Sequence, residues 1–176
     1  MVNCKICGLP FAQSKHQGEE HLCQACNYLT DKSLSVNVSP LSSNDLELVL
    51  AWRSHPQIYK HFRRQSGPLD WDDHVSWFNS RDPDRYDFII NYDGRRVGVV
   101  NINESDEVGI FVGDFSAHGH GVATAALEWL CRRFADRTPL FAEVHENNGA
   151  SKQLFDRCGF HQNQADKFWL QYKYSP

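Results

Sequence analysis

The sequence lacks the features that place a protein in a membrane or on nucleic acid. No apolar run in its 176 residues approaches the roughly 20 that a helix needs to cross a bilayer. Its first residues contain no apolar segment of a signal peptide. The 18 Lys and Arg are outnumbered by 22 Asp and Glu, so a general nucleic-acid-binding surface is not indicated. We therefore expect a cytoplasmic protein with no membrane and no nucleic-acid partner.

Cysteine is scarce outside one short segment. Four of the six cysteines form two Cys-x-x-Cys pairs, Cys4 with Cys7 and Cys23 with Cys26. Each pair places two thiolates on a tight turn, and two such turns can surround Zn²⁺ tetrahedrally. The pattern predicts a zinc ribbon over residues 1–30, in which the metal supplies most of the stability. Two disulfides and a redox pair are the alternatives.

The predicted ribbon gives little indication of what it binds besides metal. Its two lysines are balanced by Glu19 and Glu20, so it has no basic face for nucleic acid. His16 and His21 could substitute for a cysteine ligand, but four cysteines already complete a tetrahedral site.

A glycine-containing turn between an apolar strand and a helix is the most specific feature of the remaining chain. The turn His118-Gly119-His120-Gly121-Val122-Ala123 leads into apolar positions spaced three and four residues apart, which is typical of a helix. The first turn of a helix has unpaired N–H groups and the positive end of the dipole, so this turn predicts a phosphate-binding site.

Other readings of the same turn remain. The lysine of a Walker A loop is absent, and Thr124 stands where a dinucleotide fingerprint has its third glycine. An ordinary helix start is the alternative. The two histidines have no third ligand nearby and do not indicate a metal.

Hydrophobic periodicity predicts an α/β domain over residues 34–176, after the ribbon. The order of elements indicates a sheet of mixed direction. The expected strands are 34–38, 86–91, 97–102, 107–112, 140–145 and 168–174, and the expected helices are 44–53, 58–62, 71–78, 123–134 and 151–157. Asp93-Gly94 favours a tight hairpin turn between the second and third strands.

Two motifs in this domain resemble the GNAT superfamily of acetyl-CoA-dependent N-acetyltransferases. The family's pyrophosphate motif is Gln/Arg-x-x-Gly-x-Gly/Ala; Gly121 and Ala123 match it, and His118 replaces its leading residue. The second signature is Asn, a small residue and a short helix that ends in Gly-Phe, which residues 148–160 match. The resemblance covers residues 34–174. It implies a mixed, mainly antiparallel sheet flanked by helices, and acetyl-CoA as co-substrate.

The resemblance also implies where acetyl-CoA binds. Strand 107–112 would part from strand 140–145, and pantetheine would pair with the main chain near Phe111 and Val112. In the second motif, Asn148 and Phe155 would lie near the cofactor. Many members have a tyrosine at the Phe155 position, where it protonates the leaving thiolate. The pyrophosphate would be held at the turn by His118, Gly119, His120, Gly121, Val122, Ala123 and Thr124.

Acetyl transfer also needs a base that can reach the amine. We expect Glu143 to be this base, because it lies on the strand opposite the parting point. Glu107 and His145 are the reserves. The alternative for Glu143 is a strand carboxylate that points to solvent.

Motifs in the front half of the domain indicate which class of acceptor the enzyme uses. Residues 52–56 and 72–78 resemble the amino-sugar-nucleotide N-acetyltransferases of pseudaminic-acid-type pathways, and ribosomal-protein N-terminal acetyltransferases share a looser version. The predicted acceptor is therefore a nucleotide-linked amino sugar. It would contact the aromatic and basic residues Trp52, His55, Lys60, His74 and Trp77.

Three alternatives accompany this prediction. Trp52 and Trp77 could be core residues. The protein could acetylate protein N-termini or lysines and use the ribbon to dock a protein partner. It could also be a non-catalytic acyl-CoA-binding or interaction protein.

Overall fold

A computed structural model describes residues 1–12, 21–31 and 34–176 of the chain. His16, Glu19 and Glu20 of the predicted ribbon lie outside the described residues. Among the described residues, no helix has the length and apolar character needed to span a membrane.

The larger sheet is antiparallel and contains the predicted hairpin. Its strands lie in chain order, β3 (Val36–Pro40), β4 (Tyr86–Tyr92), β5 (Arg95–Ile102) and β6 (Val108–Val112). β3 lies two residues later than expected and ends at Pro40, which a sheet tolerates because β3 is an edge strand. Asp93 and Gly94 form the hairpin turn with positive φ angles of 47° and 73°.

The smaller sheet lies at the C-terminal end and is also antiparallel. It consists of β7 (Leu140–His145), β9 (Trp169–Tyr174) and β8 (His161–Asp166), in that order across the sheet. One parallel bridge, Glu107 with Phe141, joins β7 to the residue before β6. Among the described residues this bridge is the parallel pairing in an otherwise antiparallel structure, so the expected mixed direction of the sheet depends on it.

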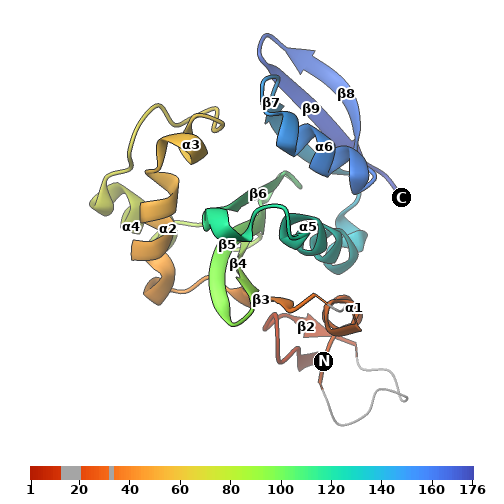
Figure 1. Cartoon of the computed structure of the whole chain (residues 1–176). Helices are drawn as coiled ribbons and strands as arrows, with labels where there is room; N and C mark the ends of the chain where they lie inside the picture. The colour runs from red at the N-terminus through yellow and green to blue at the C-terminus, as the bar shows by residue number, and fades with distance from the viewer. Residues whose placement is uncertain (13–20, 32–33) are drawn as a thin grey trace.

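Helices cover the sheets and fill the connections. α5 (Val122–Arg133) lies between the N-terminal segment and α6 (Gly149–Arg157) (Figure 1). Its buried face contacts the strands of the larger sheet. The front of the domain is formed by η1 (Ser43–Asp45), α2 (Leu46–Arg53), α3 (Pro56–Tyr59) and α4 (Trp71–Asn79). Two short 3₁₀ turns, η2 (Phe115–Ala117) and η3 (Ala135–Arg137), precede and follow α5.

The N-terminal segment packs onto the domain. β1 (Val2–Asn3) pairs with β2 (Pro10–Phe11), and α1 (Gln24–Asp31) packs against α5. The Trp129 indole N–H of α5 donates to Cys26 Sγ over 3.3 Å, and Trp129 is fully buried. The four paired cysteines therefore belong to the same apolar core as α5.

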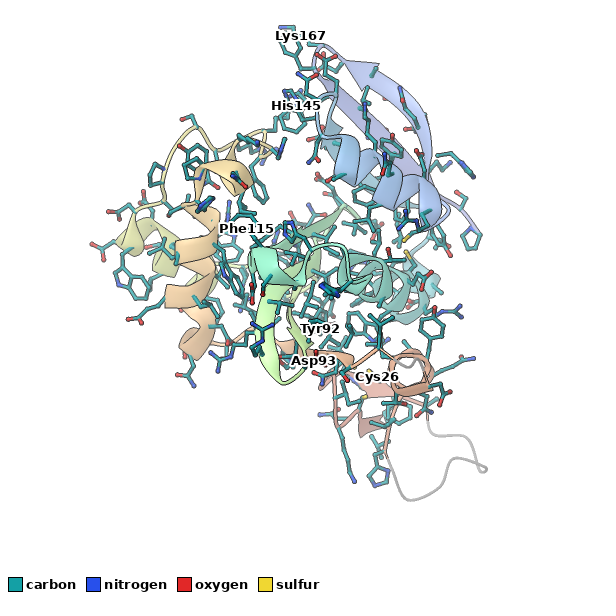
Figure 2. All side chains as sticks on the ribbon, in the orientation of Figure 1. Cys26, Tyr92, Asp93, Phe115, His145 and Lys167 are labelled. Atoms are coloured by element: carbon teal, nitrogen blue, oxygen red, sulfur yellow. The ribbon has the colours of Figure 1, made fainter. Side chains whose placement is uncertain are left out.

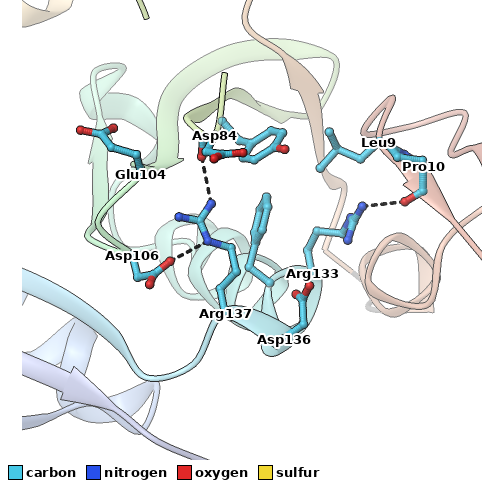
Figure 3. A pocket seen from close by; sticks show the side chains of 10 residues that line it. Leu9, Pro10, Asp84, Glu104, Asp106, Arg133, Asp136 and Arg137 are labelled. Carbon is cyan, nitrogen blue, oxygen red and sulfur yellow. Dashed lines mark hydrogen bonds and ion pairs between the residues drawn. The ribbon is translucent and has the colours of Figure 1, made fainter. Parts of the chain in front are cut away.

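A second contact ties the N-terminal segment to the domain one helical turn further along α5. Arg133 Nη2 donates to the Pro10 carbonyl over 2.9 Å, at the rim of a pocket of about 420 Å³ (Figure 3). In the same pocket Arg137 bonds Asp106 and the carbonyl of Asp84, which fixes the loop before β6.

α1 and β8 are among the elements that the sequence did not predict. α1 begins inside the second cysteine pair and buries Ala25, Cys26 and Leu29, but residues 27–33 look like a polar link. β8 is exposed at every position and has no apolar alternation, so only its pairing with β9 makes it a strand.

Gly113, just after β6, makes room for Trp52 of α2. A Cβ atom at Gly113 would lie 2.2 Å from Trp52 Cγ, a distance that requires the indole ring to move. We expect Gly113→Ala to lower the free energy of unfolding by about 1–3 kcal/mol. Since each kcal/mol lowers the melting temperature of a chain of this size by roughly 2–4 °C, we expect a fall of about 2–12 °C.

Gly67→Ala is the matched control, since a Cβ at Gly67 meets no atom within 4 Å. Thermal melts of both variants measure the difference. Equal melting temperatures for Gly113→Ala and Gly67→Ala would contradict close packing of Trp52 on this backbone.

Candidate active site

The two sheets part beyond the Glu107–Phe141 bridge and leave a cleft of about 860 Å³. The N–H of Phe141 donates to the Asp106 carbonyl over 3.0 Å, which closes this end of the gap. β6 supplies the stretch from Val108 to Val112 to the wall, and β7 supplies Glu143 and Val144. Phe111 and Val112, expected at pantetheine, therefore line the cleft.

The start of α5 lies on the wall of this cleft. Gly121 caps the helix with φ 76°, and Gly119 has φ 79°, a left-handed conformation that favours glycine. The first N–H groups of α5, at Val122, Ala123 and Thr124, have no carbonyl within the helix to bond. These residues and both glycines line the cleft, so an anion there meets N–H groups and the positive end of the dipole.

The two histidines of the turn differ in position. His118 lines the cleft, and its Nε2 lies 2.9 Å from the Val112 carbonyl, so this nitrogen donates when it carries the proton. His120 is exposed beside the ring of Tyr92, 5.9 Å away, and is not among the cleft-lining residues. Its expected contact with the pyrophosphate is therefore not supported by its position.

The second motif supplies one polar and one apolar residue to the wall. Asn148 caps α6, because its Oδ1 accepts from the Ser151 N–H over 3.1 Å. Phe155 is buried and packs against Phe160 and Tyr172, with ring centroids 5.0 and 5.9 Å away. Both residues line the cleft, and Phe155 offers it a ring edge with no hydroxyl.

Glu107 is a half-buried carboxylate at the closed end of the gap. Asn103 Nδ2 donates to it over 3.3 Å, and the Glu107 N–H donates to Asn103 Oδ1 over 2.9 Å. Burial raises the pKa of Glu107 above its ordinary value, and the negative charge of Glu143 adds to this effect. A carboxylate with a raised pKa in a cleft is suited to accept a proton.

Glu143, the expected base, lies in the same cleft but is more exposed and already paired. Its Oε1 is 2.5 Å from Arg63 Nη1, and Arg63 also bonds Asp166 over 2.6 Å. Arg63 thereby connects the loop after α3 to β7 and β8. The ion pair occupies one oxygen of Glu143, so Glu107 is the better candidate for the base.

His145, the other reserve, is not among the cleft-lining residues. Its ring stacks on Phe168 at 6.3 Å, and its Nδ1 accepts from the Asn147 N–H over 3.2 Å. Figure 2 shows it on the C-terminal sheet, well separated from Cys26. His145 ends β7, and its contacts hold the end of this strand.

The expected acceptor residues divide into two groups. Lys60 and Trp77 line the cleft, and Trp52, His55 and His74 are not among the residues of its wall. His74 is only 2% exposed and stacks on Trp77; burial lowers its pKa, followed by the charge of Arg53. Such a neutral, buried imidazole does not contact a soluble acceptor.

Trp52 and His55, which do not line the cleft, make contacts that stabilise the fold. Trp52 packs on Gly113 and against the ring of Phe111, as the core alternative expected. His55 caps α3, where its Nδ1 accepts from the Gln57 N–H, and its ring lies 4.9 Å from Phe115.

Several residues that line the cleft are not among those predicted from the sequence. They are polar or aromatic side chains that reach the cleft from separate elements: Arg53, Arg63, Arg64, Arg85, Asp87, Asn101 and Trp169. Arg53 stands inside the Trp-Arg-Ser-His-Pro motif and Arg63-Arg64 is a basic pair, so both carried a signal that could have been used.

The four paired cysteines form a compact buried cluster. The sulfur atoms of Cys4, Cys7, Cys23 and Cys26 lie within 4.8 Å of one another, and all four thiols are free. Cys7 Sγ and Cys23 Sγ are 3.9 Å apart, too far for a disulfide and close to the roughly 3.8 Å between two sulfurs on a tetrahedral Zn²⁺. The N–H groups of Cys23 and Trp129 donate to sulfurs of the cluster, as expected around thiolate ligands.

Comparison with known families agrees with this architecture. The model of the acetyltransferase (GNAT) domain family matches residues 36–161. The chain belongs to the GNAT acetyltransferase family, which confirms the predicted fold class and the predicted superfamily.

The chain also resembles individual proteins. It is 38% identical to MJ1062, an uncharacterized protein of Methanocaldococcus jannaschii, over 135 residues. The match covers 70% of this chain and 27% of that protein, so the chain spans about a quarter of that relative's length.

Solved structures share the fold. The crystal structure of a domain from Methanocaldococcus jannaschii is 32% identical with a TM-score of 0.74, over 80% of this chain and 98% of that one. A spermidine N-acetyltransferase from Vibrio cholerae, solved with CoA and spermine, is 14% identical with a TM-score of 0.69, over 79% of this chain and 93% of that one.

Proposed function

We propose that this protein transfers the acetyl group of acetyl-CoA to a primary amine of a small molecule. The observation that supports this function is one cleft with the start of α5 on its wall and the half-buried Glu107 at its closed end. The cleft thus offers a phosphate site for acetyl-CoA and a base that can deprotonate the amine.

The residues have distinct tasks in this proposal. The N–H groups at the start of α5 hold the pyrophosphate, and the parted edges of β6 and β7 align the thioester. Glu107 accepts a proton from the amine, whose nitrogen then forms the C–N bond while the C–S bond breaks. Phe155 has no hydroxyl, so water protonates the thiolate that leaves.

The acceptor that we propose is a nucleotide-linked amino sugar. Residues 52–56 and 72–78 resemble enzymes that use such acceptors, and Trp77 and Trp169 present aromatic surfaces to a cleft of sufficient size. Arginines are frequent along the same wall, which favours an acceptor with phosphates over a polyamine such as spermine.

The test is acetyl-CoA-dependent release of thiol in the presence of UDP-linked amino sugars. A Gly121→Ala variant is expected to raise the KM for acetyl-CoA about 5- to 30-fold. The left-handed conformation costs a non-glycine residue roughly 1–2 kcal/mol, which the backbone relieves by turning its N–H groups away from the phosphate.

Gly94→Ala is the matched control, because Gly94 has the similar φ of 73° in a hairpin turn outside the cleft. It should leave the KM for acetyl-CoA unchanged. No thiol release above background with any amine would overturn the proposed function, and equal KM values for the two variants would overturn the proposed phosphate site.

We further propose that the cysteine cluster binds one Zn²⁺ through Cys4, Cys7, Cys23 and Cys26. The support is the tetrahedral spacing of the sulfurs, their burial and the N–H groups that donate to them. Because the cluster belongs to the core around α5, we assign it a structural role in place of docking a protein partner. Thiolate ligands persist in a reducing compartment, which suits the cytoplasm.

A further inference from the structure

Positive side chains collect on the acceptor side of the cleft, away from the start of α5. Arg53 ends α2, Lys60 and Arg64 follow α3, and Arg85 precedes β4. These four residues converge on one cleft from three different parts of the chain. Their charges repel one another unless an anion lies between them.

Of the three carboxylates on the same wall, Asp87, Glu107 and Glu143, only Asp87 is ion-paired with a member of this group among the described residues. Asp87, whose side chain is 1% exposed, bonds Arg85 through both oxygens and also pairs with Arg81. Glu143 is engaged by Arg63. Glu107 is held by Asn103 and lies at the closed end of the gap.

Arg53 is a half-buried cation of this group that has no ion pair among the described residues. Its Nη2 donates to Gln65 Oε1 over 3.1 Å, which is a neutral partner, and its guanidinium lies 5.2 Å over the Phe62 ring. Its Nε is buried and has no hydrogen-bond partner among the described residues. Burial lowers the pKa of Arg53, the charge of Arg85 lowers it further, and the negative charge of Asp87 opposes both effects. A half-buried charge with no ion pair of its own is costly, so an anion from outside would be bound favourably.

We propose that Arg53 and Arg85 bind an anionic group that is carried by the amine acceptor itself. This inference rests on the proposed acetyl transfer and specifies its acceptor as an amine with a phosphate or carboxylate. Arg85 and Arg64 both act electrostatically on Glu107, which places the anion site near the base. Trp77 completes the site, since Arg85 lies 5.3 Å over its ring and both line the cleft.

The experiment compares acceptors with and without the anion. UDP-glucosamine and glucosamine 1-phosphate carry phosphate, glutamate carries carboxylates, and methyl glucosaminide carries neither. For the wild type we expect kcat/KM to be at least tenfold higher for one of the anionic amines than for methyl glucosaminide. Which anionic amine is preferred distinguishes a phosphate from a carboxylate site. Equal kcat/KM for methyl glucosaminide would overturn the inference.

Arg53→Gln should raise the KM for the preferred anionic amine about 10- to 100-fold, the worth of a charge-assisted hydrogen bond, and leave the KM for acetyl-CoA unchanged. Arg96→Gln is the matched control, because Arg96 is exposed, pairs with Asp45 and lies outside the cleft wall. An equal rise in KM for methyl glucosaminide would overturn the inference.

A second measurement covers the case in which Arg53→Gln does not fold. In the wild type saturated with acetyl-CoA, so that the phosphate site at the start of α5 is occupied, inorganic pyrophosphate should inhibit competitively against the amine. Competition against acetyl-CoA alone would overturn the inference.

Failure of the proposed acetyl transfer can be distinguished from failure of the anion site. If the protein shows no turnover, calorimetry of the CoA-saturated protein still measures whether UDP-glucosamine binds. Binding that Arg53→Lys or Arg53→Gln weakens supports the anion site in the absence of catalysis, and no binding overturns it.

Discussion

Glu107→Gln is expected to lower kcat by about 10²- to 10⁴-fold and to leave the KM for acetyl-CoA nearly unchanged. Glutamine keeps the size of the side chain and can still meet Asn103, but it cannot accept the proton of the amine. Glu143→Gln should have a smaller effect on kcat, because Glu143 is already paired with Arg63. Glu104→Gln, on the exposed loop three residues earlier, is the matched control and should have no effect.

The pH dependence provides a second measurement of the same role. The base must be deprotonated, so kcat/KM of the wild type should fall as the pH decreases through the pKa of Glu107, which burial holds above the ordinary value of 4.5. Glu107→Gln should remove this acidic limb. A variant that loses activity but keeps the limb would assign the titration to another group.

The same carboxylate should reduce stability. Because the folded state raises the pKa of Glu107, the folded state binds its proton more tightly than the unfolded state does. Its contribution to stability therefore decreases as the pH rises from the unfolded pKa through the folded pKa. At neutral pH Glu107→Gln should melt no lower than the wild type, so that a loss of activity cannot be attributed to unfolding.

Removal of the proposed zinc is expected to destabilise the whole domain, not only residues 1–31. Structural Zn²⁺ contributes roughly 10–16 kcal/mol in isolated fingers at pH 7, and we expect at least about 3 kcal/mol here. Cys26 is in contact with the buried Trp129, whose ring lies 4.8 Å from Phe88 of β4, so a disordered cluster disturbs the main sheet. For a chain of 176 residues this loss lowers the melting temperature by about 6–12 °C.

A strong chelator and the variant Cys26→Ser should give the same shift, and the shift from the chelator should be reversed by adding Zn²⁺. Metal analysis of the purified protein should find one zinc per chain. Cys158→Ser is the matched control, since Cys158 is half-buried outside the cluster. If Cys26→Ser melted like Cys158→Ser, or if the purified protein contained no metal, the zinc proposal would be wrong.

The sequence predicted those elements whose signal is local. The hairpin around Asp93-Gly94, the apolar face of α5 and the helix that ends at Gly159-Phe160 each depend on residues close together in the chain. The Cys-x-x-Cys pairs and the glycines before α5 belong to the same group, because a tight turn or a left-handed backbone needs a particular residue type.

Prediction failed where the secondary structure of a segment depends on residues that are distant in the sequence. β8 contains mostly polar residues and is a strand only because β9 pairs with it. α1 could not be predicted because Cys26 indicates a metal ligand in the sequence, but in the structure it is also a buried helix residue that packs towards Trp129.

The candidate site shows the same division. The sequence alone determined that a phosphate-binding turn precedes a helix and that carboxylates, aromatic residues and basic residues are available. Only the tertiary structure decided which of them meet in the cleft, because the environment of a side chain depends on strand register and on helices packed from elsewhere. Glu107 is half-buried at the bridge to Phe141 and Glu143 pairs with Arg63. Arg53 lies in the cleft, and its Nε has no hydrogen-bond partner among the described residues. These environments set the charge and access of each group, and neither property can be read from residue type.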